Sequence, residues 1–313
     1  IYLDGVVNGD QYHAFDCRIH NNSAFIGGGL HFTNHVDAVF ELSSFWENNA
    51  YIGGLGMFTN WSSAFNTSNL VNNRAFFGGV VETASTAGSQ NWSTFNNSLF
   101  KGNSADLAGG SVNLNNRNMA CSNCLFIDNT AETGAVFSVW GLDDMAGGEL
   151  TLQSCTLSNN HAEVSGGAIL PSDESLISMK DTIIWGNSPD QFPDLGNFDL
   201  RYSNIQDGWP GGGVYVIDED PLFVFGPSGG YYLSQQAAGQ ADDSPCLDSG
   251  SDWASALQYP WGLDTMTTRT DQVFDTGLAD MGYHYFYNDG PPVPTPTPTI
   301  TPEPTITPTF TPS

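Results

Sequence analysis

The chain has 313 residues, with 34 acidic side chains against only 7 Lys and Arg, and a formal net charge of −27. Affinity for nucleic acid comes largely from Lys and Arg that displace counterions, so this charge argues against nucleic-acid binding, polybasic membrane contact and capture of anionic polymers. No run of 18 apolar residues occurs, and 40% hydrophobic residues with 35 Gly indicate a folded, turn-rich, all-β chain.

A four-residue unit, apolar-x-x-Asn, recurs along the first two thirds of the chain. Its asparagines are spaced by about 27 residues; they are Asn22, Asn48, Asn73, Asn103, Asn129, Asn160 and Asn187. Ala follows two residues after six of them, and a Gly pair then follows in five. The positions three and eight before the Asn are apolar, and the position five before is small. Such alternation is typical of short strands with one buried face.

A repeat of this length, with tight Gly turns and no helical period, predicts one coil of a parallel β-solenoid. Successive coils would stack at about 4.8 Å, so the Asn column would form a ladder of amide hydrogen bonds. Asn also tolerates the left-handed backbone that we expect at this corner. A degenerate copy at Leu200, Ser203 and Ile205 brings the prediction to about eight coils. Leucine-rich repeats and propeller blades fit less well, because no fixed Leu pattern or period of 40–45 residues is present.

Several of these units resemble a known family of repeats. Phe45–Asn48, Phe100–Asn103 and Phe126–Asn129 match the Phe-x-x-Asn tetrapeptide of polymorphic outer-membrane proteins, and Gly166–Ile169 matches their Gly-Gly-Ala-apolar tetrapeptide. This resemblance implies a right-handed parallel β-helix on a bacterial surface.

The remainder of the chain divides into two parts. The segments Tyr202–Gln206, Asp220–Phe223, Tyr232–Ser234, Ser244–Asp248 and Asp280–Tyr283 occur in that order. Together they are similar to the closing segment of bacterial β-helix proteins with a choice-of-anchor domain, which implies export and tethering. Residues 291–313 are dominated by Pro and Thr, which predicts an extended, disordered spacer. We therefore expect β-helix repeats over 1–217, an irregular β-rich closing segment over 218–287 and a linker over 288–313.

The termini bear on location. The chain begins at Ile1 without a charged and then apolar leader, and it stops inside the Thr-Pro tract. We expect any signal peptide and any anchor to lie outside this sequence, and the protein to be secreted or held at the cell surface, in the outer membrane or cell wall, as a monomer.

The cysteines fit the repeat columns. Cys124 and Cys155 occupy the small-residue column, and Cys121 occupies an apolar column, so core packing explains the Cys121–Cys124 spacing better than a zinc or redox pair. A bridge between Cys124 and Cys155 stays open for an exported protein.

Catalytic candidates are few. Asp143 and Asp144 resemble the neighbouring carboxylates of β-helix pectin hydrolases, but the Asn-Thr-Asp, Gly-His-Gly and Arg-x-Lys motifs of that family do not occur. The seven cations share no column, which disfavours a lyase. No metal-ligand motif is present; we predict no cofactor, with loose calcium binding by the acidic surface left open.

Three tryptophans are candidates for sugar binding. Trp61, Trp92 and Trp140 follow the strands after the Gly pairs, two of them next to insertions at 84–94 and 141–149. Insertions in solenoids tend to lie on one face, and exposed Trp rings can stack on sugars; packing of each ring over its own coil is the simpler alternative. The sequence thus favours a non-catalytic surface β-helix, an adhesin, passenger or scaffold that contacts extracellular glycans or a neighbouring cell. A polysaccharide hydrolase or lyase and a carbohydrate-binding module are the alternatives.

Overall fold

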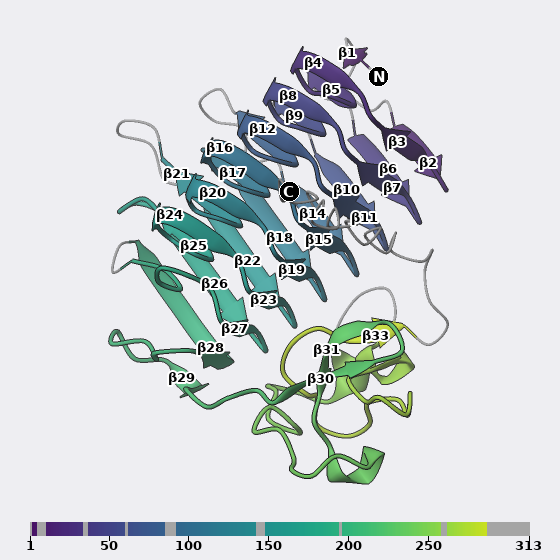
Figure 1. Ribbon diagram of the computed structural model, residues 1–313, viewed down its shortest axis with the longest axis vertical. Coiled ribbons are helices and arrows are strands. Elements are labelled where there is room, and N and C mark those ends of the chain that lie inside the picture. Colours follow the sequence, from purple (N-terminus) through teal and green to yellow (C-terminus); the bar gives the residue numbers. More distant parts are fainter. Residues whose placement is uncertain are drawn as a thin grey trace, which may run out of the picture.

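The computed structural model describes residues 2–4, 11–33, 37–59, 62–84, 92–141, 148–193, 196–257 and 262–286. The strands stack coil upon coil into a solenoid, and an irregular segment packs against one side of it (Figure 1). The predicted all-β parallel solenoid is confirmed. No helix in the described ranges is long and apolar enough to cross a membrane.

Three parallel sheets form the solenoid. The first contains β1 (Tyr2–Asp4), β5 (Leu30–Thr33), β9 (Gly56–Thr59), β13 (Val81–Ala84), β17 (Val112–Asn115), β21 (Phe137–Trp140) and β25 (Ile169–Pro171). The third contains β4 (Ser23–Ile26), β8 (Asn49–Ile52), β12 (Arg74–Phe77), β16 (Ser104–Ala108), β20 (Thr130–Thr133) and β24 (His161–Ser165).

The second sheet has two columns of strands. The long-strand column contains β2 (Gln11–Phe15), β6 (Asp37–Glu41), β10 (Ser63–Asn66), β14 (Trp92–Asn96), β18 (Asn118–Ser122), β22 (Glu149–Gln153) and β26 (Leu176–Lys180). The short-strand column contains β3 (Arg18–His20), β7 (Ser44–Trp46), β11 (Asn69–Val71), β15 (Leu99–Lys101), β19 (Leu125–Ile127), β23 (Thr156–Ser158) and β27 (Ile183–Trp185). Strand β28 (Asn197–Ile205) pairs with both columns and with β29 (Val214–Ile217).

The seven repeated asparagines form a continuous ladder. Each Nδ2 donates to the Oδ1 of the next Asn at 2.8–3.1 Å, from Asn22 through to Asn187. The same Oδ1 also accepts from the backbone N–H of the preceding Asn. At the last coil, Asn187 donates instead to Gln191 Oε1 at 2.8 Å. Because buried amides are costly without partners, this ladder fixes the register between coils.

The corner beside the ladder differs in one respect from the expectation. The left-handed residue precedes the ladder Asn, as at Glu47 (φ 54°) and Asp128 (φ 57°), and the ladder asparagines themselves do not adopt positive φ. The ladder Asn therefore needs its amide for hydrogen bonds along the axis, while its neighbour makes the turn.

The Gly pairs have two separate structural roles. Gly53 has φ 63°, which favours glycine. A Cβ on Gly54 would lie 2.0 Å from the carbonyl oxygen of Gly79 in the next coil. The first Gly thus makes the turn, and the second permits close approach of consecutive coils.

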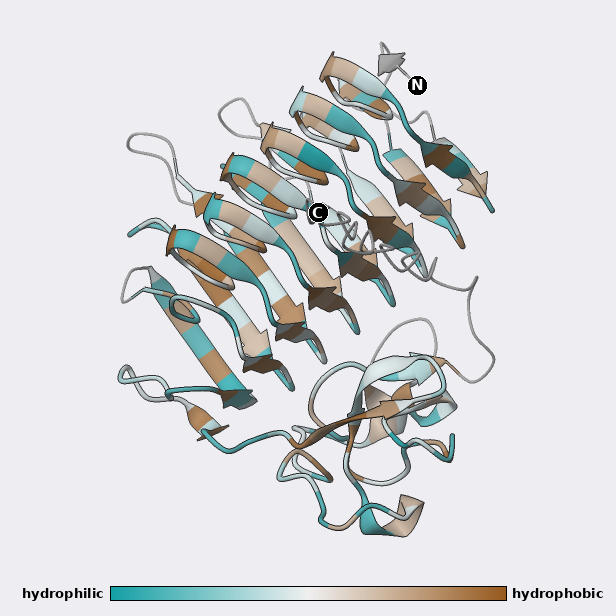
Figure 2. Cartoon of the chain, in the orientation of Figure 1, coloured by the Kyte–Doolittle hydropathy of each residue, from teal (hydrophilic) through white to brown (hydrophobic). Residues whose placement is uncertain are grey.

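The core runs along the axis as columns of like residues. Phe65 stacks between Phe40 and Phe95, with ring centroids 5.0 and 4.8 Å away. Cys121, Cys124 and Cys155 are buried and free, and burial raises the pKa of each thiol. The predicted apolar columns are therefore core, and Figure 2 shows the hydrophobic residues gathered on the strands.

The segment after β29 is irregular, as expected, with short antiparallel pairs. It contains β30 (Phe223–Gly226) with β31 (Gly229–Leu233), β32 (Met266–Thr267) with β33 (Tyr285–Phe286), and single 3-10 turns η1 (Gln236–Ala238), η2 (Ala254–Ala256) and η3 (Leu263–Thr265). This closing segment packs against the outer face of the short-strand column. Tyr283 N donates to Thr156 Oγ1 at 2.9 Å, and Ser251 N and Oγ donate to the Asp181 carboxylate at 2.6 and 2.7 Å.

Candidate functional site

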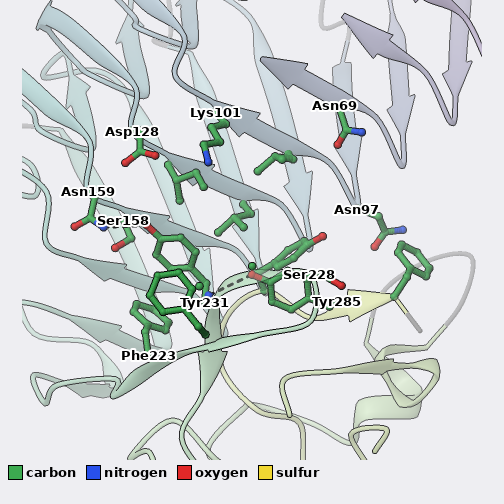
Figure 3. A pocket seen from close by; sticks show the side chains of 18 of the residues that line it. Asn69, Asn97, Lys101, Asp128, Ser158, Asn159, Phe223, Ser228, Tyr231 and Tyr285 are labelled. Atoms are coloured by element: carbon green, nitrogen blue, oxygen red, sulfur yellow. Dashed lines mark hydrogen bonds between the residues drawn. The ribbon is translucent and has the colours of Figure 1, made fainter. Parts of the chain in front are cut away.

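A cleft of about 760 Å³ lies where the closing segment meets the short-strand column (Figure 3). Its solenoid side extends over five consecutive coils, from Asn69 on β11 to Trp185 on β27. The other side is formed by the β30–β31 hairpin and by residues around β33.

The floor of the cleft is aliphatic, and strand alternation explains why. On β19, Phe126 points into the core, so Leu125 and Ile127 point outward. Both are nevertheless buried, and Leu99 continues the floor on β15. Outward apolar side chains would be unfavourable on an open face, and here the closing segment removes them from water.

The opposite wall is aromatic. Tyr231 packs against Phe223 edge to face, with ring centroids 5.2 Å apart, and Tyr285 stacks on Tyr232 at 4.0 Å. Tyr285 Oη accepts from Tyr231 N at 3.3 Å. These contacts fix the orientation of the rings, while Phe225 at the mouth is 89% exposed.

Polar side chains surround the apolar interior. Asn159 Nδ2 donates to Tyr231 Oη at 2.9 Å, and burial together with nearby Asp128 raises the pKa of Tyr231 despite this hydrogen bond. Figure 3 places Asn159 and Asp128 toward one end of the cleft and Asn69 and Asn97 toward the other, with Lys101 between them. The cleft can therefore hold a ligand with apolar faces and polar edges.

The site residues predicted from sequence do not occur among the described residues that line the cleft. Asp143, Asp144 and Trp61 fall outside the described residues. Trp92 is half-buried on β14 and Trp140 is 39% exposed on β21, so they lie on different sheets. Neither lines the cleft. Trp140 Nε1 donates to Ser138 Oγ at 2.5 Å, on the outer face of the first sheet.

That outer face also carries a buried carboxyl group that sequence analysis did not single out. Glu82 is 6% exposed, and its Oε1 accepts from Asn115 Nδ2 at 2.5 Å. Burial raises the pKa of Glu82 to about 8, although Asn113 and Asn115 oppose this shift. Within the described part of the chain, Glu82 Oε2 and Asn113 Oδ1 have no hydrogen-bond partner.

A second buried polar cluster lies inside the closing segment. Asp275, Asp280 and His284 are the one group of three potential metal ligands in the described ranges. Their acceptor atoms already face donors: Asp275 Oδ2 accepts from Asp280 N at 2.9 Å and lies 2.8 Å from His284 Nε2, and Asp280 Oδ1 accepts from Asp248 N at 2.8 Å. Thr268 Oγ1 donates to Asp280 Oδ2. This geometry is that of a hydrogen-bonded structural cluster.

Comparisons with protein-family models, with curated proteins and with solved structures give no match. The cleft residues contributed by the closing segment were missed in the sequence because that segment has no repeat. One signal was available on the solenoid side: Leu125 and Ile127 are apolar at outward positions that hold Ser44 on β7 and Lys101 on β15.

Proposed function

We propose that this protein is a non-catalytic, cell-surface β-helix that binds carbohydrate in the cleft between the short-strand column and the closing segment. The observation that carries this proposal is the aromatic wall facing an aliphatic floor, with amide side chains at both ends. A pyranose ring has apolar C–H faces that pack on aromatic rings and hydroxyl edges that hydrogen-bond to amides. The surface location is supported by the resemblance of the repeats and of the closing segment.

The non-catalytic part of the proposal rests on carboxylate count. Glycoside hydrolysis generally uses two carboxyl groups flanking the bond. Asp128 is the one carboxylate among the residues that line the cleft in the described structure.

A glycan array followed by calorimetric titration of the full chain tests the proposal. Tyr231→Ala should weaken binding at least tenfold, which corresponds to about 1.4 kcal/mol. The matched control is Tyr51→Ala, because Tyr51 is 44% exposed on β8, away from the cleft. Reducing-sugar and unsaturated-product assays on bound glycans should be negative.

Aromatic grooves also bind proline-rich peptides, so a synthetic peptide with the sequence of residues 291–313 belongs in the same titrations. Binding of this peptide without binding of any glycan would overturn the carbohydrate proposal. Turnover of a bound glycan would overturn its non-catalytic part.

A further inference from the structure

We infer that the ligand of the cleft is an uncharged oligosaccharide, and that Lys101 and Asp128 determine its specificity by hydrogen-bonding to neighbouring sugar hydroxyls. This inference rests on the proposed carbohydrate-binding function and names the class of sugar.

The first observation is the charge of the cleft. Lys101 and Asp128 are the two charged residues among those that line it in the described structure, and their charges cancel. The whole chain, by contrast, carries 34 acidic residues against 7 Lys and Arg. A net charge of −27 repels an acidic polysaccharide over long range, and Asp128 offsets the one cation that could hold it locally. An uncharged chain experiences neither effect.

The second observation is that both charges are available to a ligand. Lys101 pairs in register with Ile127, and Asp128 directly follows Ile127, so the two residues belong to adjacent coils. In the described ranges neither forms an ion pair, whereas Arg74, Arg201 and Arg269 all do.

The chemistry of the pair is complementary. An ammonium group only donates hydrogen bonds and a carboxylate only accepts them, whereas a sugar hydroxyl does both. Two neighbouring hydroxyls can therefore accept from Lys101 and donate to Asp128 at the same time. A sugar with one of these hydroxyls inverted or removed would leave a charged group unpaired. The cost of that unpaired group discriminates between sugars more strongly than the gain from the hydrogen bond itself.

The length of the cleft indicates that its ligand is an oligosaccharide and not a single sugar. Its floor extends over five coils, and four spacings of about 4.8 Å give a length of about 19 Å. That length exceeds a single pyranose ring, so several consecutive sugar units lie along the solenoid axis.

The test compares neutral hexose oligomers with the corresponding uronic-acid oligomers by calorimetric titration of the full chain. Neutral oligomers should bind with an affinity that changes less than twofold between 50 and 500 mM salt, because binding involves no net charge. Lys101→Gln and Asp128→Asn should each reduce this affinity at least tenfold. The matched controls Lys180→Gln and Asp173→Asn, both outside the cleft, should leave it unchanged.

The outcomes separate this inference from the proposed function. Preferential binding of uronic-acid oligomers, or unchanged affinity in both cleft variants while Tyr231→Ala abolishes binding, overturns the inference and leaves carbohydrate binding in place. Absence of binding to every glycan overturns both.

Discussion

Asn123 and His284, which are 161 positions apart in the chain, exchange two hydrogen bonds. His284 N donates to Asn123 Oδ1 at 2.7 Å, and Asn123 Nδ2 donates to His284 O at 2.9 Å. Asn123 lies at the corner between β18 and β19, and His284 lies between two tyrosines of the cleft. This pair therefore holds the cleft wall on the solenoid.

Asn123→Ala should detach the closing segment. It leaves the buried N–H and C=O of His284 without partners, at a cost of about 2–5 kcal/mol. Urea unfolding and limited proteolysis would detect this as early release of the segment. Asn72→Ala is the matched control, since Asn72 has the same left-handed backbone (φ 53° against 49°) at an exposed corner. Equal effects of both variants would indicate a backbone cost instead of lost docking.

His284 makes this docking dependent on pH. Its Nδ1 lies 3.0 Å from Gly282 O and its Nε2 lies 2.8 Å from Asp275 Oδ2, so both nitrogens face acceptors. Burial opposes the charge, but Asp275 and Asp280 outweigh it and raise the pKa of His284. Asp181 also acts on His284 electrostatically. Burial and Asp275 raise the pKa of Asp280 to about 6.

Both raised pKa values make the folded closing segment less stable as the pH rises. The His284 contribution is complete below the unfolded-state pKa of about 6.5 and is lost as pH rises through its folded-state pKa. The protonated Asp280 contribution is lost between about pH 4 and 6. Urea unfolding should therefore show weaker docking at pH 9 than at pH 6, and His284→Gln should remove most of that difference. An unchanged pH profile in His284→Gln would contradict this assignment.

Glu82 should reduce stability as the pH increases. The unfolded carboxyl ionises near pH 4.5, whereas the folded one stays protonated to about pH 8, so stability falls across this interval by an amount on the order of 3–5 kcal/mol. Glu82→Gln should match the parent near pH 4 and be more stable at pH 8, in urea unfolding at both values. The control Glu163→Gln, exposed on β24, should not reproduce the gain.

The loss of stability on replacing a ladder Asn should depend on how deeply that Asn is buried. Asn103→Ala removes hydrogen bonds to Asn73, Leu70 and Asn129 inside the core, which should cost about 3–5 kcal/mol. Asn22→Ala at the exposed first coil should cost below about 1 kcal/mol, because its amide is open to water. Chemical denaturation of both variants measures the gradient, and equal losses would contradict the dependence on burial.

The fold was predictable because stacking in register repeats each weak signal seven times. The apolar columns of the sequence form the core, the column of small residues lies at a corner, and the Asn column forms the ladder. The turn beside the ladder was misplaced by one residue, since Glu47 and not Asn48 adopts the left-handed backbone. The sequence does not show which of these two neighbouring residues makes the turn, because Asn fits both a left-handed turn and an amide ladder.

The cleft was not predictable in the same way. Tyr231 and Tyr285 belong to a segment without a repeat, and contacts such as Asn123–His284 decide where they lie. Of the tryptophans singled out in the sequence that the structure describes, Trp92 lies half-buried in the long-strand column and Trp140 lies exposed on the first sheet. Apolar outward residues such as Leu125 and Ile127 indicated that the short-strand column is covered.

The direction of the ladder limits how the length of this molecule can change. Every amide donates toward the following coil, so joining Asn73 to the coil of Asn129 by deleting residues 74–103 keeps each donor opposite an acceptor. A deletion that does not run from one ladder Asn to another leaves the following coil out of phase. Since each coil contacts mainly its neighbours, whole coils are the unit of variation. The same deletion removes β15 and shortens the cleft floor by one strand spacing, so the number of coils sets the length of the cleft.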